Sequence, residues 1–348
     1  METGRRGPMS NNKLVNGLIK LTERLRSVLK NSIPAYSCRK SRHTYKQYQL
    51  AVIWCLMKRK KEDYRGIIEL LELTPKLRQL IGLSQLPHFT TINKFFLRTN
   101  TSAIYNALVQ SVSLFTNDKC ILSIDSTGYS ASYASRHYLW RIGLGSYTRR
   151  KHIKLSISVN TDNQCIIAAK PRLSPRNDNI DFPLLARQSA SLANPAYIVA
   201  DKGYDSEANH VLADQLGSHA VIPLKVREGC RTGGRFRRRM IKEFNEQVYH
   251  RRSIVETVNS VMKRLMGSWV RSRSLAHQCK EAIGMCLVYN VHRSIKVLLF
   301  YGWFLQSLAL RKKKKGFICT QANQSHFSHS SQLLSQPNVS FWMGWAPN

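Results

Sequence analysis

The segment "CILSID" (Cys120–Asp125) is a short apolar run with strand-forming residues that ends in a carboxylate. A second segment, "AYIVAD" (Ala196–Asp201), has the same form. Between them, "HIKLSISVN" (152–160) and "QCIIAAKPRL" (164–173) flank the turn-forming "TDN" and predict a hairpin. Helical patterns alternate with the later strands, including "HAVIPLK" (219–225). This order predicts an α/β domain in which helices flank a mixed sheet.

Both apolar strands that end in an aspartate lead into a turn of small residues. If Asp125 and Asp201 follow neighbouring parallel strands, their side chains converge on one crevice at the carboxyl edge of the sheet. An aspartate at the end of an apolar strand is costly to bury unless a cation compensates it. The pair therefore suggests a metal site, although a single such residue is more often an ordinary strand end.

A basic helix, "YHRRSIVETVNSVMK" (249–263), contains a single acid, Glu256. Helical spacing places its apolar side chains in one stripe: Ile254, Val258, Val261, Met262 and Leu265. The opposite face carries Tyr249, Arg252, Glu256 and Lys263. The simplest interpretation of that face is a solvated surface with an Arg252–Glu256 pair, which contributes only about 0.2–0.5 kcal/mol.

The four residues of that face also fit a spacing of Y-(2)-R-(3)-E-(6)-K without a gap. This pattern resembles the signature of DDE transposases from bacterial and archaeal insertion sequences, in insertion-sequence families four and five. The segments "IDSTGY", "ASRHY" (134–138) and "ADKGYDS" resemble the first and second carboxylate regions of the same group, with family five the closer match. The resemblance covers roughly residues 45 to 300.

The resemblance implies a ribonuclease-H-like catalytic domain over residues 118–300. In it, Asp125, Asp201 and Glu256 would hold two Mg²⁺ or Mn²⁺ ions, which prefer oxygen ligands and can assist an in-line displacement at phosphorus. Tyr249, Arg252 and Lys263 would contact DNA. Three further acids near these segments are expected to be structural or to support the site: Asp178, Asp181 and Asp205.

The implied activity is metal-dependent cleavage at the element's terminal inverted repeats, followed by strand transfer into target DNA. The implied partners are those DNAs and a second copy of the chain in a synaptic complex, in a prokaryotic cytoplasm at the nucleoid. Two alternatives stay open: a decayed copy that binds DNA without catalysis, and a simple metal-dependent nuclease of the same fold.

The charge of the chain favours a nucleic-acid partner independently of any resemblance. Lys and Arg number 54 against 20 Asp and Glu, which gives a formal charge of +34, while 43% of the residues are hydrophobic. Such a chain is globular with a positive surface, and its partner is expected to be a polyanion, with DNA before an anionic membrane. An arginine-rich stretch just before the Glu256 helix is expected to be a loop that tracks the duplex through Arg235, Arg237, Arg238 and Arg239.

The remaining segments give the domain organisation. Residues 1–12 are expected to form a flexible arm, 13–115 a helical N-terminal domain and 311–348 a basic, disordered tail. Within the helical domain, Thr74–Arg98 suggests a helix-turn-helix whose second helix is capped by Thr90 or Thr91. The alternative is a helical cap that only packs.

Membrane and zinc interpretations are weaker. The uncharged run Val297–Leu310 has 14 residues, whereas a spanning helix needs about 20, so a buried C-terminal helix is expected. The N-terminus has no apolar core of the signal-peptide kind, and the eight scattered cysteines are expected to be free thiols. The set His277, Cys279, Cys286 and His292 does not have a common zinc-site spacing.

Overall fold

The computed structural model describes residues 11–116, 119–130, 152–174, 177–225 and 233–322. The chain forms two compact units, Met1–Leu298 and Leu299–Asn348, and the sheet and the site lie in the first. The segment "ASRHY" (134–138) lies outside the described residues.

The described part begins with six α-helices and a 3-10 turn. These are α1 (Asn11–Ser32), α2 (Gln47–Lys60), α3 (Gly66–Leu73), α4 (Pro75–Ile81), α5 (Phe89–Arg98), α6 (Thr101–Val112) and η1 (Ser113–Phe115). Helix α4 ends at Gly82, whose φ of 80° suits a residue without a Cβ. Helix α5 begins earlier than expected, because His88 and not a threonine occupies its N-cap.

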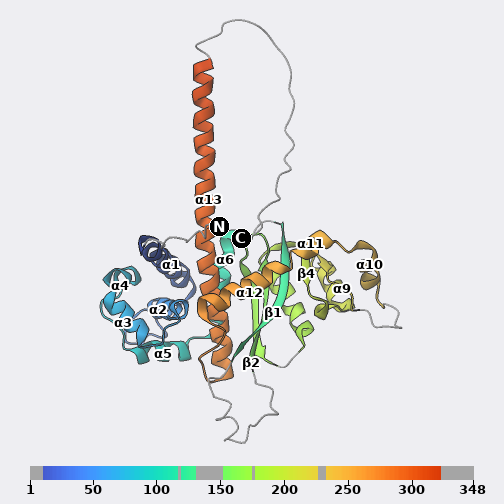
Figure 1. The fold of residues 1–348 in the computed structure, drawn as a ribbon. Helices are drawn as coiled ribbons and strands as arrows, with labels where there is room; N and C mark the ends of the chain where they lie inside the picture. Colours follow the sequence, from blue (N-terminus) through green and yellow to red (C-terminus); the bar gives the residue numbers. More distant parts are fainter. Residues whose placement is uncertain (1–10, 117–118, 131–151, 175–176, 226–232, 323–348) are drawn as a thin grey trace, which may run out of the picture. The chain divides into compact units, whose positions relative to one another are not determined.

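The sheet has five strands in the order β3-β2-β1-β4-β5 (Figure 1). Their bounds are β1 (Lys119–Ser130), β2 (His152–Asn160), β3 (Ile166–Leu173), β4 (Asn194–Ala200) and β5 (His219–Val221). Strands β1, β2 and β3 pair antiparallel, whereas β4 runs parallel to β1 and β5 parallel to β4. The predicted mixed sheet is therefore present. Strand β1 continues past its expected end at Asp125, because it pairs with β2 as far as Ser130↔His152.

Between residues 177 and 252, the described chain forms six further helical segments. They are η2 (Asp178–Asp181), α8 (Phe182–Ala190), η3 (Lys202–Tyr204), α9 (Glu207–Gln215), α10 (Arg235–Glu243) and α11 (Glu246–His250). Two of them differ from the sequence expectation. The arginine-rich stretch is not a loop, because helix α10 occupies it. The basic helix that was expected to run unbroken from Tyr249 is divided into α11 and α12 (Ser253–Met266) by a turn at Arg251 and Arg252.

The two faces of the sheet bury different side chains. Alternation along β2 sends Ile153, Leu155 and Ile157 into the core that also contains Val255, Val258 and Met262 of α12. On the opposite face, β1 and β4 pack against α8 and α9 through a second core that includes Leu122, Ile124, Ile198, Phe182, Leu185 and Leu212. Figure 1 shows α12 lying across β1, and the two elements are in contact.

The N-terminal helices share the first of these cores. It is continuous from Leu25 of α1 and Trp54 of α2 to Tyr129 of β1 and Met262 of α12. A buried ion pair joins Lys58 of α2 to Glu281 of the last helix, α13 (Leu275–Ala322). The helical region and the sheet are therefore packed around common side chains.

Helix α13 includes residues 311–322 of the segment that we expected to be a disordered tail. Residues 323–348 lie outside the described part. None of the helices in the described residues has the length and apolar character needed to cross a membrane.

Candidate active site

Asp125 and Asp201 follow paired residues of two neighbouring parallel strands. Ile124 of β1 pairs with Ala200, the last residue of β4, so each aspartate directly follows a residue of this pair, Asp125 within β1 and Asp201 just after β4. Asp125 alternates with Ile124 and lies on the face that α12 covers. Asp201 is exposed and caps the turn η3, where its Oδ1 accepts a hydrogen bond of 2.7 Å from the amide of Lys202.

Glu256 is placed in the first turn of α12, directly above β1. The hydroxyl of Ser123 on β1 donates to the carbonyl of Arg252, at 3.2 Å, and fixes the start of this helix over the strand. The Arg252 guanidinium in turn lies 2.7 Å from the Glu256 carboxylate. The i,i+4 pair expected from the sequence is therefore present.

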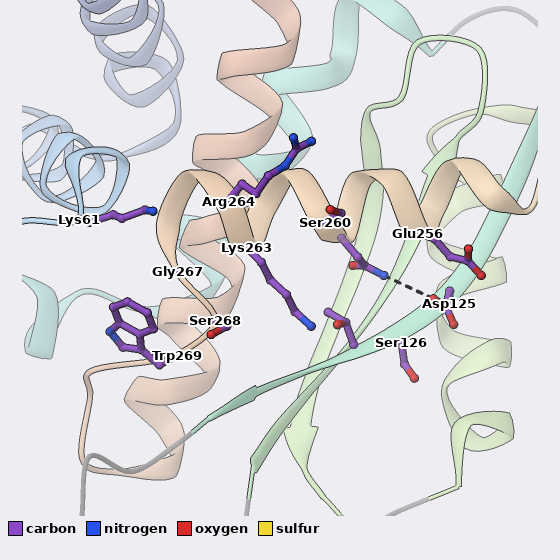
Figure 2. Close-up of a pocket in the computed structure, with 12 residues that line it drawn as sticks. Lys61, Asp125, Ser126, Glu256, Ser260, Lys263, Arg264, Gly267, Ser268 and Trp269 are labelled. Carbon is purple, nitrogen blue, oxygen red and sulfur yellow. Dashed lines mark hydrogen bonds between the residues drawn. The ribbon is translucent and has the colours of Figure 1, made fainter. Parts of the chain in front are cut away.

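A cavity of about 590 Å³ lies between α12 and β1 (Figure 2). Asp125 and Glu256 line it at one end, and Lys263, Arg264, Lys61 and Trp269 line it farther along the helix. Asp201 does not line this cavity. Over the described ranges of the chain, no three His, Cys, Asp or Glu side chains are grouped closely enough to hold a metal ion. The imagined zinc set around Cys279 and Cys286 is therefore not assembled either.

The electrostatics of Asp125 link the three carboxylates. Burial raises the pKa of Asp125, and the negative charges of Glu256 and Asp201 raise it further. The Ser126 amide and the Arg252 guanidinium oppose this shift without cancelling it. For Arg252, burial lowers the pKa, but the charges of Glu256, Tyr249 and Asp201 outweigh this effect and the pKa is raised. Asp125 is thus a half-buried acid that lacks sufficient positive charge nearby.

Asn259 is the site residue that sequence reasoning did not assign. It is 6% exposed, and its Nδ2 donates to Oδ2 of Asp125 over 3.4 Å. Its own Oδ1 is buried without a hydrogen-bond partner. The available signal was its position three residues after Glu256, on the same helical face.

The three weaker acids are held by specific partners. Asp178 accepts from the Ser126 hydroxyl at 2.8 Å and pairs with Lys154. Asp181 is fully buried and is held by Arg172 and by the Ser156 hydroxyl, at 2.7 Å. These contacts lie on the side of β1 and β2 that faces away from α12.

Asp205 makes a different contact, with the arginine-rich helix. Arg237 donates to its two oxygens over 2.9 and 2.7 Å, and the Lys225 amide donates at 2.7 Å. Arg237 is therefore bound within the protein, unlike Arg235 and Arg238, which form no ion pair in the described part of the chain. Arg239 pairs with Glu243 on the surface, 2.5 Å apart.

The other residues of the proposed signature lie on the same helical segment, but only Lys263 lines the cavity. The Arg252 guanidinium lies 5.9 Å from the ring of Tyr249, so the turn between α11 and α12 keeps these two side chains together. The Lys263 ammonium extends toward β1 and lies 5.7 Å from the ring of Tyr129 (Figure 2). Of the four residues of the signature, Glu256 and Lys263 line the cavity, whereas Tyr249 and Arg252 do not.

Comparison with known proteins identifies the family to which the chain belongs. No curated protein matches the chain. Among solved structures, it is similar to a piggyBac transposase in a synaptic complex with hairpin DNA, at 12% identity and a TM-score of 0.41, over 82% of this chain and 73% of that one. The model of the transposase DDE domain matches residues 116–291, just over half of the chain, and this match contains both strand-end aspartates and Glu256. The chain therefore belongs to the family of proteins that carry a transposase DDE domain.

Proposed function

We propose that this chain is a DNA transposase whose catalytic carboxylates are Asp125, Asp201 and Glu256. The observation that carries the proposal is the pairing of Ile124 with Ala200, because Asp125 and Asp201 directly follow this pair and Asp125 lines one groove with Glu256. The strand order, with three antiparallel strands extended by two parallel ones, supports a ribonuclease-H-like catalytic domain. The Tyr249–Lys263 spacing supports a relationship to insertion-sequence families four and five.

Divalent ions fit the chemistry of this donor set. Three carboxylates supply the oxygen ligands that Mg²⁺ and Mn²⁺ prefer, and a cation would offset the charge that raises the pKa of Asp125. Asp125, Asp201 and Glu256 would hold two such ions. When bound, the ions would supply charge stabilisation for an in-line displacement at a phosphodiester. Glu256 would have to exchange its contact with Arg252 for the metal, and its exposed side chain is free to do so.

The cations around the groove are proposed to hold the DNA strand. Arg252 and Lys263 would contact phosphates near the cleaved bond, and the ring of Tyr249 would pack against a base or sugar. Arg235, Arg238 and Arg239 of α10 would track the duplex farther away, while Arg237 would keep that helix in place. A second copy of the chain would pair the two element ends.

Cleavage by carboxylate variants tests the proposal. The substrate is a duplex that contains an inverted repeat found beside the gene, with Mg²⁺ or Mn²⁺ present. Asp125→Ala, Asp201→Ala and Glu256→Ala should each lower the cleavage rate by several orders of magnitude, because the ions carry the charge stabilisation. Binding should change little, because affinity comes mainly from phosphate contacts. Glu246→Ala, which removes an exposed acid from α11, is the matched control.

The outcomes separate the alternatives. Near-normal cleavage by Asp201→Ala would contradict the carboxylate assignment. Cleavage without joining of the 3′ end to target DNA would favour a simple nuclease. Specific binding by the wild type without any cleavage would favour a decayed copy.

Recognition of the element ends is proposed for the helical region 13–115. Helix α5 exposes Lys94 and Arg98 beside buried Ile92, Phe95 and Phe96, so one face of the helix packs and the other is available to DNA. In the full chain, Lys94→Ala with Arg98→Ala should reduce the preference for repeat DNA over scrambled DNA. An unchanged preference would place recognition elsewhere.

A further inference from the structure

The groove between α12 and β1 does not end at the carboxylates. Beyond them it is lined by Lys263 and Arg264 in the last turn of α12, by Trp269, and by Lys61, which follows α2. In Figure 2, Lys61 extends toward the end of α12 from the side opposite the sheet strands. One wall of this end of the groove thus comes from the N-terminal helical region.

The backbone of Lys61 is held firmly in this position. It has a left-handed conformation, with φ of 62°, and closes α2 through a hydrogen bond of 3.2 Å from its amide to the Lys58 carbonyl. Its own carbonyl accepts from Nη2 of Arg271 at 2.8 Å. Arg271 is fixed in turn, because its amide donates to the buried carboxylate of Glu281 at 2.8 Å. The exposed ammonium of Lys61 therefore extends from a rigid base.

This end of the groove has positive charge that nothing in the described structure neutralises. Lys61, Lys263 and Arg264, here called the distal cationic cluster, take part in no ion pair within the described residues. Within the described residues, the carboxylates that line the groove are Asp125 and Glu256, and they lie at its other end. Two cations at the end of α12 are expected from the helix dipole, but Lys61 belongs to another helix and needs a separate explanation.

The length of the groove matches a bound DNA strand. From Glu256 to Arg264 the helix advances eight residues, or about 12 Å at a rise of about 1.5 Å per residue. Phosphates of one strand advance about 3.4 Å per nucleotide along a duplex. A strand whose scissile phosphate lies at Glu256 would therefore place another phosphate, a few nucleotides away, at the distal cationic cluster.

We propose that Lys61 completes a second phosphate-binding subsite with Lys263 and Arg264, so that the N-terminal helical region positions the DNA strand in the catalytic groove. This rests on the proposed function, because it assumes DNA at the carboxylates. Lys61 is a positioning residue in this arrangement and does not touch the reacting atoms. Its side chain differs from that of Lys60, which is exposed one residue earlier but does not line the groove.

Lysine footprinting on the wild-type full chain tests this subsite. The protein is acetylated with and without a mixed-sequence DNA duplex, and each lysine is quantified by mass spectrometry. Lys61 and Lys263 should be protected by DNA, whereas Lys60 should react equally in both samples. Protection of Lys263 without Lys61 would overturn the subsite and leave the proposed function intact. Protection of neither would contradict DNA binding in the groove, and with it the proposed function.

Variants supply a second measurement. Lys61→Gln should weaken duplex binding. It should also make the negative slope of log affinity against log salt shallower by about one, because one phosphate contact is lost. Lys60→Gln should leave both unchanged, and the two variants should have the same Tm. A lower Tm for Lys61→Gln with an unchanged salt slope would show that Lys61 only stabilises the end of α12, and would overturn the proposal.

Discussion

At the scale of single residues, the surroundings of Asp125 disfavour its ionised form, which costs stability but suits a carboxylate that is proposed to bind a cation. Its raised pKa means that the folded protein holds the proton more tightly than the unfolded chain does. The stability that comes from protonated Asp125 is fully present below the unfolded pKa, about 3.9, and is lost as the pH rises through the folded pKa. Above the unfolded pKa, this stronger proton binding by the folded state means that Asp125 destabilises the fold relative to an uncharged residue.

Asp125→Asn should accordingly raise the Tm at pH 7 without divalent ions, while it abolishes cleavage. The gain should shrink as the pH falls from 7 toward about 4 and be lost below it, because the wild-type residue is then protonated in both states. Thermal melts of both proteins across this pH range measure the effect. A lower Tm for the variant at pH 7 would contradict the assignment of Asp125 as an undercompensated charge.

Added Mg²⁺ gives a related result that needs no DNA. A ligand that binds only the folded state raises its stability, so wild-type Tm should increase with Mg²⁺ concentration. Asp125→Asn should lose most of that increase. An equal increase in both proteins would place the bound ion elsewhere.

The cations beside Glu256 should differ in importance. The Arg252–Glu256 pair is partly exposed, so its loss should cost well under 1 kcal/mol of stability. A cation beside the scissile phosphate stabilises charge in the transition state, and removing it costs on the order of a hundredfold in rate. We therefore expect Arg252→Ala to reduce single-turnover cleavage of bound repeat DNA by about a hundredfold, and Lys263→Ala by less.

Arg251→Ala is the control for this prediction. Arg251 neighbours Arg252 but pairs with Asp162 and donates to Thr161, away from the groove. If Arg252→Ala and Lys263→Ala both cleaved at the wild-type rate, this helical face would be an ordinary solvated surface with no role in cleavage.

Some of the site could be predicted from residue spacing alone, and some could not. The positions of Asp125 and Asp201 follow from where two apolar strands end, and the Arg252–Glu256 contact follows from helical periodicity. The hydrogen bond of Asn259 to Asp125 joins residues 134 positions apart, and it depends on how α12 packs on β1. The spacing of residues within one helix or strand does not determine how α12 is oriented on β1.

At the scale of elements, α10 shows what the sequence could not provide. Its segment has no apolar stripe wide enough to predict a packed helix, and none of its residues is buried. Its position comes from α9 and the turn before it. Glu207 accepts from the amides of Phe236 and Arg237, at 2.9 and 3.0 Å, and Asp205 binds the Arg237 side chain. A tertiary cap, and not local propensity, orders this basic helix.

Asp205→Ala should therefore release α10. The substitution leaves Arg237 without its partner and should cost about 1–3 kcal/mol of local stability. Trypsin should then cut at Arg235–Arg239 roughly tenfold faster or more, since about 1.4 kcal/mol corresponds to a factor of ten. The rate of appearance of the two fragments measures this opening.

Glu243→Ala is the matched control within the same helix. It removes the exposed partner of Arg239, and surface pairs of this kind contribute little. Equal tryptic rates for Asp205→Ala and Glu243→Ala would show that α10 is held by something other than the buried contact.

Other element boundaries were predictable to within a few residues. The hairpin of β2 and β3 and the helices α8 and α9 follow from turn residues and apolar spacing. The extension of β1 to Ser130 does not, because it depends on pairing with β2 across the segment 131–151. The division between α11 and α12 also has no local signal in the basic run around Arg251.

At the scale of the molecule, the helical region and the sheet are built around one core. The sequence suggested a separate domain at 13–115, because its periodicity is helical and a polar break follows it. Periodicity cannot show that the apolar faces of these helices pack on α12 and α13. Contacts such as Lys58–Glu281, and the donation from Lys280 to the carbonyl of Phe96 at 2.8 Å, are visible only in the folded chain. For this reason, DNA recognition is best tested in the full chain.

Helices α2 and α13 of this shared core approach each other closely at Gly284. A Cβ added at Gly284 of α13 would lie 2.4 Å from the ring of Trp54, which is 3% exposed and stacks on Phe96 at 4.8 Å. Gly284→Ala should gain up to about 1 kcal/mol from helix propensity. Overpacking typically costs about 1–3 kcal/mol, so the net effect should be a loss of stability.

Gly17→Ala in α1 is the control, because nothing lies within 4 Å of its added Cβ, and it should gain only the stability that comes from helix propensity. Denaturant unfolding of the full chain measures both. If Gly284→Ala proved as stable as Gly17→Ala, the helical region could move away from α13 at little cost, and Lys61 would lose its fixed position at the groove.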